Sequence, residues 1–158
     1  SWSAPFIMAP INTKNIHRSN FLLGHRYGMD FRYDEMLLTG DGEQGKATAE
    51  FVAKDDSVAK SELQPGDGPT KEERENGDYE AIFAGTSSDG ELMISSVKGD
   101  RDPGYGSTSK MLAEAAMCLL KNPELASGGL WTPAAALGEK LVERLEAHAG
   151  LTFEIEQG

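Results

Sequence analysis

The stretch GDRDPGYGSTSK at residues 99–110, followed by MLAEAAMCLL at residues 111–120, is the part of the chain around which the fold is expected to form. Its first eight residues contain three glycines and a proline, so the backbone can adopt positive φ angles and approach a ligand or another segment closely. Ser107 is placed to cap the helix that follows, whose outward N–H groups and dipole favour an anion. Residues 111–120 carry one charged side chain, which predicts a central, nearly buried helix.

Two interpretations of residues 99–110 are open. A glycine-rich loop before a helix most often serves packing as a turn, and the order Gly-Tyr-Gly-Ser-Thr matches neither a Walker phosphate loop nor the Gly-x-Gly-x-x-Gly dinucleotide fingerprint. In the functional interpretation, the hydroxyls of Tyr105 and Thr108 and the ammonium group of Lys110 stand beside the helix start and bind a ligand.

Composition narrows the classes of protein to which this chain can belong. With 158 residues, 39% of them hydrophobic and 26% charged, it is predicted to be a single globular domain. Its net charge of −11 argues against nucleic acid or an anionic membrane as the main partner. We also expect no membrane span, no signal peptide and no metal site. The single cysteine, Cys118, cannot form an internal disulfide, which fits a cytoplasmic protein.

A crowded polar face distinguishes residues 5–23, which are predicted to form a helix that Pro10 can interrupt and Gly24 ends. Its polar side chains are mostly amides and hydroxyls rather than the Glu and Lys of a solvated helix face: Asn12, Asn15, His17, Arg18, Ser19 and Asn20. They can line a substrate pocket, or they can form an interdomain contact or a capping network. His17 by itself is more often a structural histidine than a catalyst.

The remaining patterns predict an α+β fold. Residues 78–85 and 91–99 are expected to form a hairpin, and Thr70 with Glu73 the capping box of a short helix. Other predicted strands cover residues 31–38 and 151–156, other predicted helices cover 45–58 and 133–149, and a turn-rich loop covers 63–69. This order lacks regular βαβ alternation, so we expect a mixed or antiparallel sheet of about four or more strands, with helices packed on one face.

Several motifs, in order along essentially the whole chain, carry a family resemblance. They are PFIM (5–8) with Asn12-Thr13, HRSNxLLG (17–24), DFRY (30–33), PGDGP (65–69), GDxDPGY (99–105), MLAE (111–114) and GGxWTPA (128–134). Together they resemble the C-terminal part of bacterial saccharopine dehydrogenase-like oxidoreductases, in the branch that includes trans-acting enoyl reductases.

The resemblance implies a division of labour between two domains. Members of this family hold NAD or NADP in an N-terminal Rossmann domain, and their C-terminal domain binds the small-molecule substrate and forms dimer contacts. Since no Gly-x-Gly-x-x-Gly follows a strand in this sequence, we expect residues 1–158 to be the C-terminal domain of a longer enzyme, without its Rossmann partner. The chain alone is then expected to be an inactive homodimer that holds no cofactor.

Site residues follow from the loop and the polar face together. The predicted substrate-binding residues are Asn12, His17, Arg18, Asn20, Tyr105, Thr108 and Lys110, and the predicted cofactor-binding residues are Gly104 and Gly106. Arg18 and Lys110 would orient an acidic or carbonyl-bearing substrate, and Tyr105 or Thr108 would bond a carbonyl oxygen or the cofactor ribose. The motifs assign no catalytic residue. The competing hypothesis is a free-standing, non-catalytic module that binds a partner protein through the same polar face.

Overall fold

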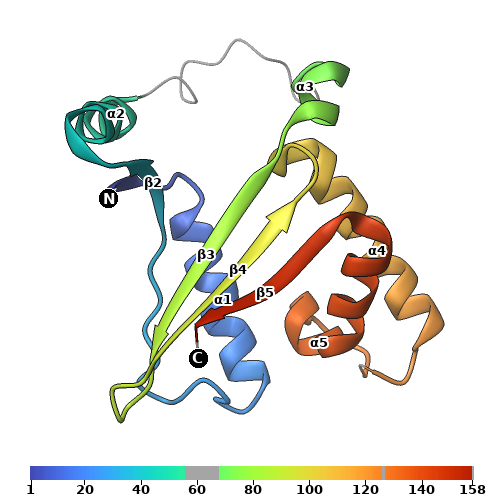
Figure 1. The fold of residues 1–158 in the computed structure, drawn as a ribbon. Coiled ribbons are helices and arrows are strands. Elements are labelled where there is room, and N and C mark those ends of the chain that lie inside the picture. The colour runs from blue at the N-terminus through green and yellow to red at the C-terminus, as the bar shows by residue number, and fades with distance from the viewer. Residues whose placement is uncertain (56–67, 126, 158) are drawn as a thin grey trace. The chain divides into compact units, whose positions relative to one another are not determined.

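A computed structural model describes residues 1–55, 68–125 and 127–157 (Figure 1). The chain divides into two compact units, and each is described by itself. Unit 1 comprises Ser1–Gln64 and Leu130–Ala135, and unit 2 comprises Pro65–Gly129 and Ala136–Gly158. Most of the predicted loop at 63–69 and the end of the predicted helix at 45–58 lie outside the described residues.

Unit 1 contains a two-stranded sheet and two helices. Strand β1 (Trp2–Pro5) pairs antiparallel with β2 (Met36–Gly40), and the helices are α1 (Ala9–Leu22) and α2 (Gly42–Lys54). The helix predicted from residue 5 therefore begins four residues later, since the first residues form β1 and Pro10 lies in the first turn of α1. The predicted strand at 31–38 is shifted, because residues 31–35 are irregular.

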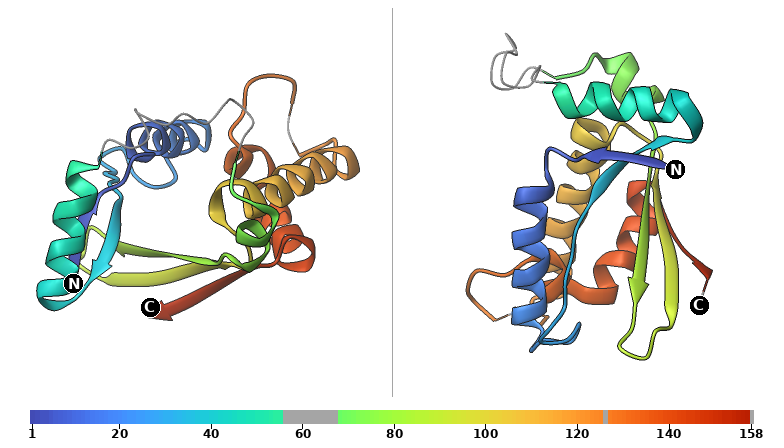
Figure 2. Two further views of the ribbon diagram at one scale, coloured as in Figure 1. Left: turned by 90° about the horizontal axis from the view of Figure 1, so that it is seen from above. Right: turned by 90° about the vertical axis from the view of Figure 1, so that its left-hand side faces the viewer.

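Unit 2 contains a three-stranded antiparallel sheet in the order β3 (Tyr79–Thr86), β4 (Leu92–Gly99), β5 (Leu151–Gln157). The predicted hairpin is confirmed as β3 and β4. The helical elements are α3 (Lys71–Asn76), the π-helical turn η1 (Pro103–Ser107), α4 (Thr108–Lys121), α5 (Pro133–Arg144), whose first three residues belong to unit 1, and the π-helical turn η2 (Leu145–Ala149). The left view of Figure 2 shows α4 and η2 on one face of this sheet.

The core of unit 2 is small. Leu145 and Ala149 of η2 pack with Leu151, and Val97, Met111 and Phe153 join them. Cys118 of α4 is fully buried against Ala136 and Leu137. The prediction that residues 111–120 are buried nearly all round is wrong, because Leu112 and Leu120 are 71% and 74% exposed. Only one side of α4 meets the sheet and η2.

The α+β class and the antiparallel pairing are confirmed. The strands that the structure describes divide between two sheets, one in each unit. Within residues 1–55, 68–125 and 127–157, no helix has both the length and the apolar character needed to cross a membrane.

Candidate functional site

The loop at residues 99–110 folds around the carboxylate of Asp102. The backbone N–H groups of Gly104 and Tyr105 each donate to Oδ1 at 3.0 Å, and that of Gly106 donates to Oδ2 at 2.5 Å. These bonds, led by that from Tyr105, hold the pKa of Asp102 below its usual range. Asp102 is therefore the cap of the η1 turn, with Pro103 in the first helical position.

The predicted cap at Ser107 is wrong for the same reason. Ser107 is fully buried inside the continuous η1–α4 helical path, and its hydroxyl shares a 2.9 Å hydrogen bond with the Tyr79 hydroxyl. The N–H groups expected to point outward at the loop are occupied by Asp102. Any ligand that used them would have to displace this carboxylate.

Gly106 in this loop and Gly77 at the end of α3 let the two segments approach closely. A Cβ on Gly106 would lie 2.8 Å from the carbonyl oxygen of Arg74, and a Cβ on Gly77 would lie 2.8 Å from the backbone nitrogen of Asp102. The Asp102 N–H donates to the same Arg74 oxygen at 3.3 Å. The predicted capping box of Thr70 and Glu73 is confirmed at the start of α3. These contacts between α3 and the loop support the interpretation that the loop serves packing.

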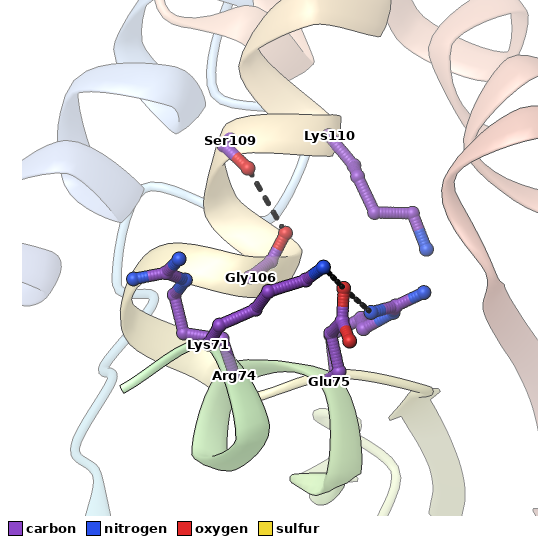
Figure 3. Close-up of a pocket in the computed structure, with 7 residues that line it drawn as sticks. Lys71, Arg74, Glu75, Gly106, Ser109 and Lys110 are labelled. Carbon is purple, nitrogen blue, oxygen red and sulfur yellow. Dashed lines mark hydrogen bonds and ion pairs between the residues drawn. The ribbon is translucent and has the colours of Figure 1, made fainter. Parts of the chain in front are cut away.

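The contact between α3 and the loop creates a pocket of about 290 Å³ (Figure 3). Helix α3, the η1 turn, α4 and the loop between β4 and η1 contribute its lining: Lys71, Arg74, Glu75, Arg101, Gly106, Ser109 and Lys110. Four of these seven residues are basic and one is acidic. The pocket therefore offers cationic side chains to an anionic ligand.

Partners of these charged groups define the electrostatics of the pocket. Glu75 Oε1 lies 3.8 Å from both Lys71 Nζ and Arg101 Nη1. Lys110 Nζ donates to Asp100 Oδ1 at 2.8 Å, and Arg74 Nη1 donates to the Pro69 carbonyl oxygen at 2.8 Å. Of the predicted site residues, Lys110 alone supplies a charge here. The sequence interpretation missed Lys71, Arg74, Glu75 and Arg101, although the first three have the spacing of one helix face.

Tyr105 and Thr108 lie on the same loop with different surroundings. The Thr108 hydroxyl donates to the Pro103 carbonyl oxygen at 2.7 Å, so it closes the η1 turn. The Tyr105 side chain is about half exposed, and its ring lies so close to Gly68 that a Cβ there would approach it to 2.9 Å.

In unit 1, the polar face of α1 is engaged with neighbouring loops. The amide of Asn20, 4% exposed, donates to the Gly28 carbonyl oxygen at 2.9 Å and accepts from the Tyr27 N–H at 2.8 Å. Arg18 Nη2 donates to the Leu130 carbonyl oxygen at 3.0 Å. These bonds fasten residues 25–28 and the segment around residue 130 to α1.

A second polar group in unit 1 is centred on Glu35. Asn12 Nδ2 donates to Glu35 Oε1 at 2.8 Å, and the Tyr33 hydroxyl donates to Glu35 Oε2 at 2.7 Å. Burial, followed by the bond to Glu35, raises the pKa of Tyr33 to about 12. His17 packs edge-on against Phe31, with ring centroids 5.5 Å apart. Glu35 was missed as the partner of Asn12, because their contact joins a helix to a segment 23 residues away.

Across the parts of the chain that the structure describes, no group of three or more His, Cys, Asp or Glu side chains could hold a metal ion. The residues that line the pocket in unit 2 offer charge recognition and hydrogen bonding.

Comparison with known proteins gives one consistent result. A Mycobacterium tuberculosis protein named "Putative trans-acting enoyl reductase" is 35% identical to this chain, and the match covers 97% of the chain's own length. Proteins named trans-acting enoyl reductase from Mycobacterium bovis and Mycobacterium ulcerans are 30% and 28% identical over 91% of it. No family model and no solved structure matches the chain. The chain spans about two fifths of the length of these curated relatives, 41% of the first and 39% of the other two. Over that part it is similar to proteins named as enoyl reductases.

Proposed function

We propose that this chain is the substrate-binding and dimerisation part of an NAD(P)-dependent oxidoreductase of the enoyl reductase kind. The observation that carries the proposal is the similarity, over 97% of the chain, to a protein named as an enoyl reductase. Such an enzyme reduces a carbon–carbon double bond conjugated to a carbonyl group, and a bound nicotinamide supplies the hydride. In this proposal a Rossmann domain outside the chain holds NAD or NADP.

The loop at residues 99–110 does not fit a dinucleotide pyrophosphate as it stands. The N–H groups of Gly104 and Gly106, which the sequence predicted to contact the cofactor, donate to Asp102. A Cβ at Gly106 would also meet the carbonyl oxygen of Arg74. Both observations favour a packing role for these glycines, and they support the assignment of the cofactor to another domain.

For the substrate, the proposal uses groups of unit 2. In unit 2, Tyr105 supplies a phenolic hydroxyl to the carbonyl oxygen, and Lys110 supplies a cation for a charged group elsewhere on the substrate. Charge develops on the carbonyl oxygen of the substrate when hydride adds to the conjugated double bond, and a positioned cation or donor stabilises it. In unit 1, Arg18, Asn12 and Asn20 hold neighbouring segments in place.

Calorimetric titration of the 158-residue chain with a phosphate-free probe, a trans-2-enoyl N-acetylcysteamine thioester, tests this proposal. We expect saturable binding that Tyr105→Phe weakens about two- to tenfold, the equivalent of about 0.5–1.5 kcal/mol for one hydrogen bond. Thr108→Val is expected to lower the melting temperature and leave affinity unchanged, because its hydroxyl donates to Pro103. Lys140→Ala, on α5 and paired with Glu143, is the control. Absence of binding by the folded chain would contradict the proposal.

A further inference from the structure

We propose that the pocket between α3 and the η1–α4 junction binds a phosphate monoester group through Lys71, Arg101 and Lys110. In this proposal the phosphate group takes the position that the Glu75 carboxylate has beside Lys71 and Arg101 in the structure. This inference deepens the proposed function, on which it rests for the ligand being a substrate or cofactor of a reductase. It names the chemical class of the ligand that this pocket takes.

The first observation is a concentration of positive charge in an acidic chain. The chain has a net charge of −11, yet four of the seven residues that line this pocket are basic. Arg74 Nη1 donates to the neutral Pro69 carbonyl oxygen, and Lys110 Nζ donates to the Asp100 carboxylate. The proposal uses Lys71, Arg101 and Lys110, which are cations from three separate parts of unit 2. A local positive site in a negative surface selects for anions.

The second observation is the position of the Glu75 carboxylate. Its Oε1 atom lies 3.8 Å from Lys71 Nζ and 3.8 Å from Arg101 Nη1, and the dashed lines that meet at Glu75 in Figure 3 mark these two ion pairs. One oxygen atom is therefore shared by two cations, and both distances exceed those of a hydrogen bond. Glu75 and Lys71 are 50% and 79% exposed, and exposed ion pairs of this length contribute little stability. An oxyanion can therefore replace the Glu75 carboxylate beside Lys71 and Arg101 with little loss of free energy.

The third observation is that Lys110 is held at the pocket by other residues. Its ammonium group donates to Asp100 at 2.8 Å. The Asp100 carboxyl group in turn lies in the space that a side chain at residue 150 would fill, and residue 150 is a glycine. Gly150 has φ of +72°, and a Cβ there would lie 2.3 Å from the Asp100 carboxyl carbon. Gly150 thus makes room for Asp100, and Asp100 fixes Lys110. Lys110 is about one-third exposed, so its charge remains accessible.

A phosphate group fits this arrangement better than a carboxylate. It has two negative charges and three terminal oxygens near neutral pH, so it can engage the Arg101 fork and two ammonium groups together. Ser109 also lines the pocket, and its hydroxyl, which donates to the Gly106 carbonyl oxygen at 3.0 Å, is a further donor within the lining. The phosphate can belong to the carrier of a thioester substrate, such as the 3′-phosphate of coenzyme A, or to the 2′ position of an NADP molecule whose nicotinamide and pyrophosphate the Rossmann domain holds.

The test is calorimetric titration of the 158-residue chain with inorganic phosphate at constant ionic strength. We expect saturable binding that Lys71→Met and Arg101→Met each weaken about tenfold or more, as for hydrogen bonds to charged groups. Glu75→Gln, which removes the competing charge and keeps the shape, is expected to tighten binding about fivefold or more. Lys140→Ala is the matched control on another helix, and circular dichroism confirms that each variant is folded.

Two pairs of ligands distinguish the sources of the phosphate. NADP is compared with NAD, and coenzyme A with dephospho-coenzyme A, since each pair differs by one phosphate group. A preference of about tenfold for the phosphorylated member, lost in Arg101→Met, supports the proposal and identifies the source. Three results would overturn the proposal. They are the absence of saturable phosphate binding, phosphate binding that the Lys71 and Arg101 variants leave unchanged, and equal affinity for the two members of both ligand pairs. The thioester titration with the phosphate-free probe is a separate measurement, so failure of one proposal is distinguishable from failure of the other.

Discussion

At the scale of single residues, Asp102 determines what the loop at residues 99–110 can do. Its carboxylate accepts three backbone N–H groups, so the loop closes on itself instead of presenting donors to a ligand. The recognition chemistry then passes from the backbone to the side chains around the loop, namely Lys71, Arg101 and Lys110. The glycine-rich loop therefore serves mainly as a packing surface for α3.

The stabilisation by Asp102 is expected to depend on pH. Its pKa is lower in the folded chain than in the unfolded chain, so its contribution is present above the unfolded value near 3.9 and is lost as pH falls through the folded value. Asp102→Ala should therefore lower the melting temperature at pH 7, and the difference from the parent chain should shrink below about pH 4. Thermal melts from pH 7 to pH 2 measure it, with Glu124→Ala as the exposed control. A difference that stayed constant over this range would contradict the assignment.

At the scale of elements, α4 is an amphipathic helix with one buried side. Cys118 and Met111 face the core clusters, whereas Leu112, Leu119 and Leu120 are exposed. The sequence of residues 111–120 is apolar nearly all round, so it could not reveal which side meets the sheet. That side is set by η2 and β5, which lie about 30 residues further along the chain.

Two leucines in unit 2 test this arrangement. Leu145 is 7% exposed in the cluster with Ala149 and Leu151, so Leu145→Ala should cost about 2–5 kcal/mol of the free energy of unfolding. Leu112 is 71% exposed, so Leu112→Ala should change it by about 0.5 kcal/mol or less. Urea unfolding followed by circular dichroism gives both values. Equal losses in the two variants would mean that the burial described for α4 and η2 is incorrect.

Elements with their own local chemistry could be predicted from the sequence. The hairpin of β3 and β4, the capping box of α3 and the α5 start at Pro133 all have turn or cap residues at fixed spacing. Strand β1 could not be predicted, because a four-residue strand depends on pairing with β2 more than thirty residues away. Of the residues that line the pocket, only Lys110 and Gly106 were among the predicted site residues. The pocket's other cations are brought there by the contact of Gly77 and Gly106 with neighbouring backbone, and no local pattern records such a contact.

At the scale of the whole molecule, the sheet of unit 2 supports the proposed dimer. Val97 and Phe153 face the core beneath η2, and by strand alternation Phe83, Met93 and Ile155 continue the same face toward its other end. These three side chains are 42%, 54% and 75% exposed. An apolar face of this kind is typical of a surface that a partner covers, and we propose a second copy of the chain.

Light scattering tests the dimer. We expect a mass about twice the 17.0 kDa of one chain at micromolar concentration, and Ile155→Asp should shift it toward the monomer because the change buries a charge in the interface. Ile82→Asp is the matched control, since Ile82 is 53% exposed on the opposite face of the sheet. A mass of one chain throughout the micromolar range, or equal effects of the two variants, would contradict a dimer formed through this face.

The central claim is that this chain binds the substrate of a reductase and leaves hydride transfer to another domain. The most direct measurement follows absorbance at 340 nm with the 158-residue chain, NADPH or NADH, and the trans-2-enoyl thioester at a concentration that saturates the chain by calorimetry. A full-length trans-acting enoyl reductase that turns over this thioester is the positive control. We predict thioester binding without any oxidation of NADPH or NADH above the rate of the protein-free mixture. Oxidation by the chain alone that requires the thioester would contradict the claim, because the chain would then hold its own cofactor.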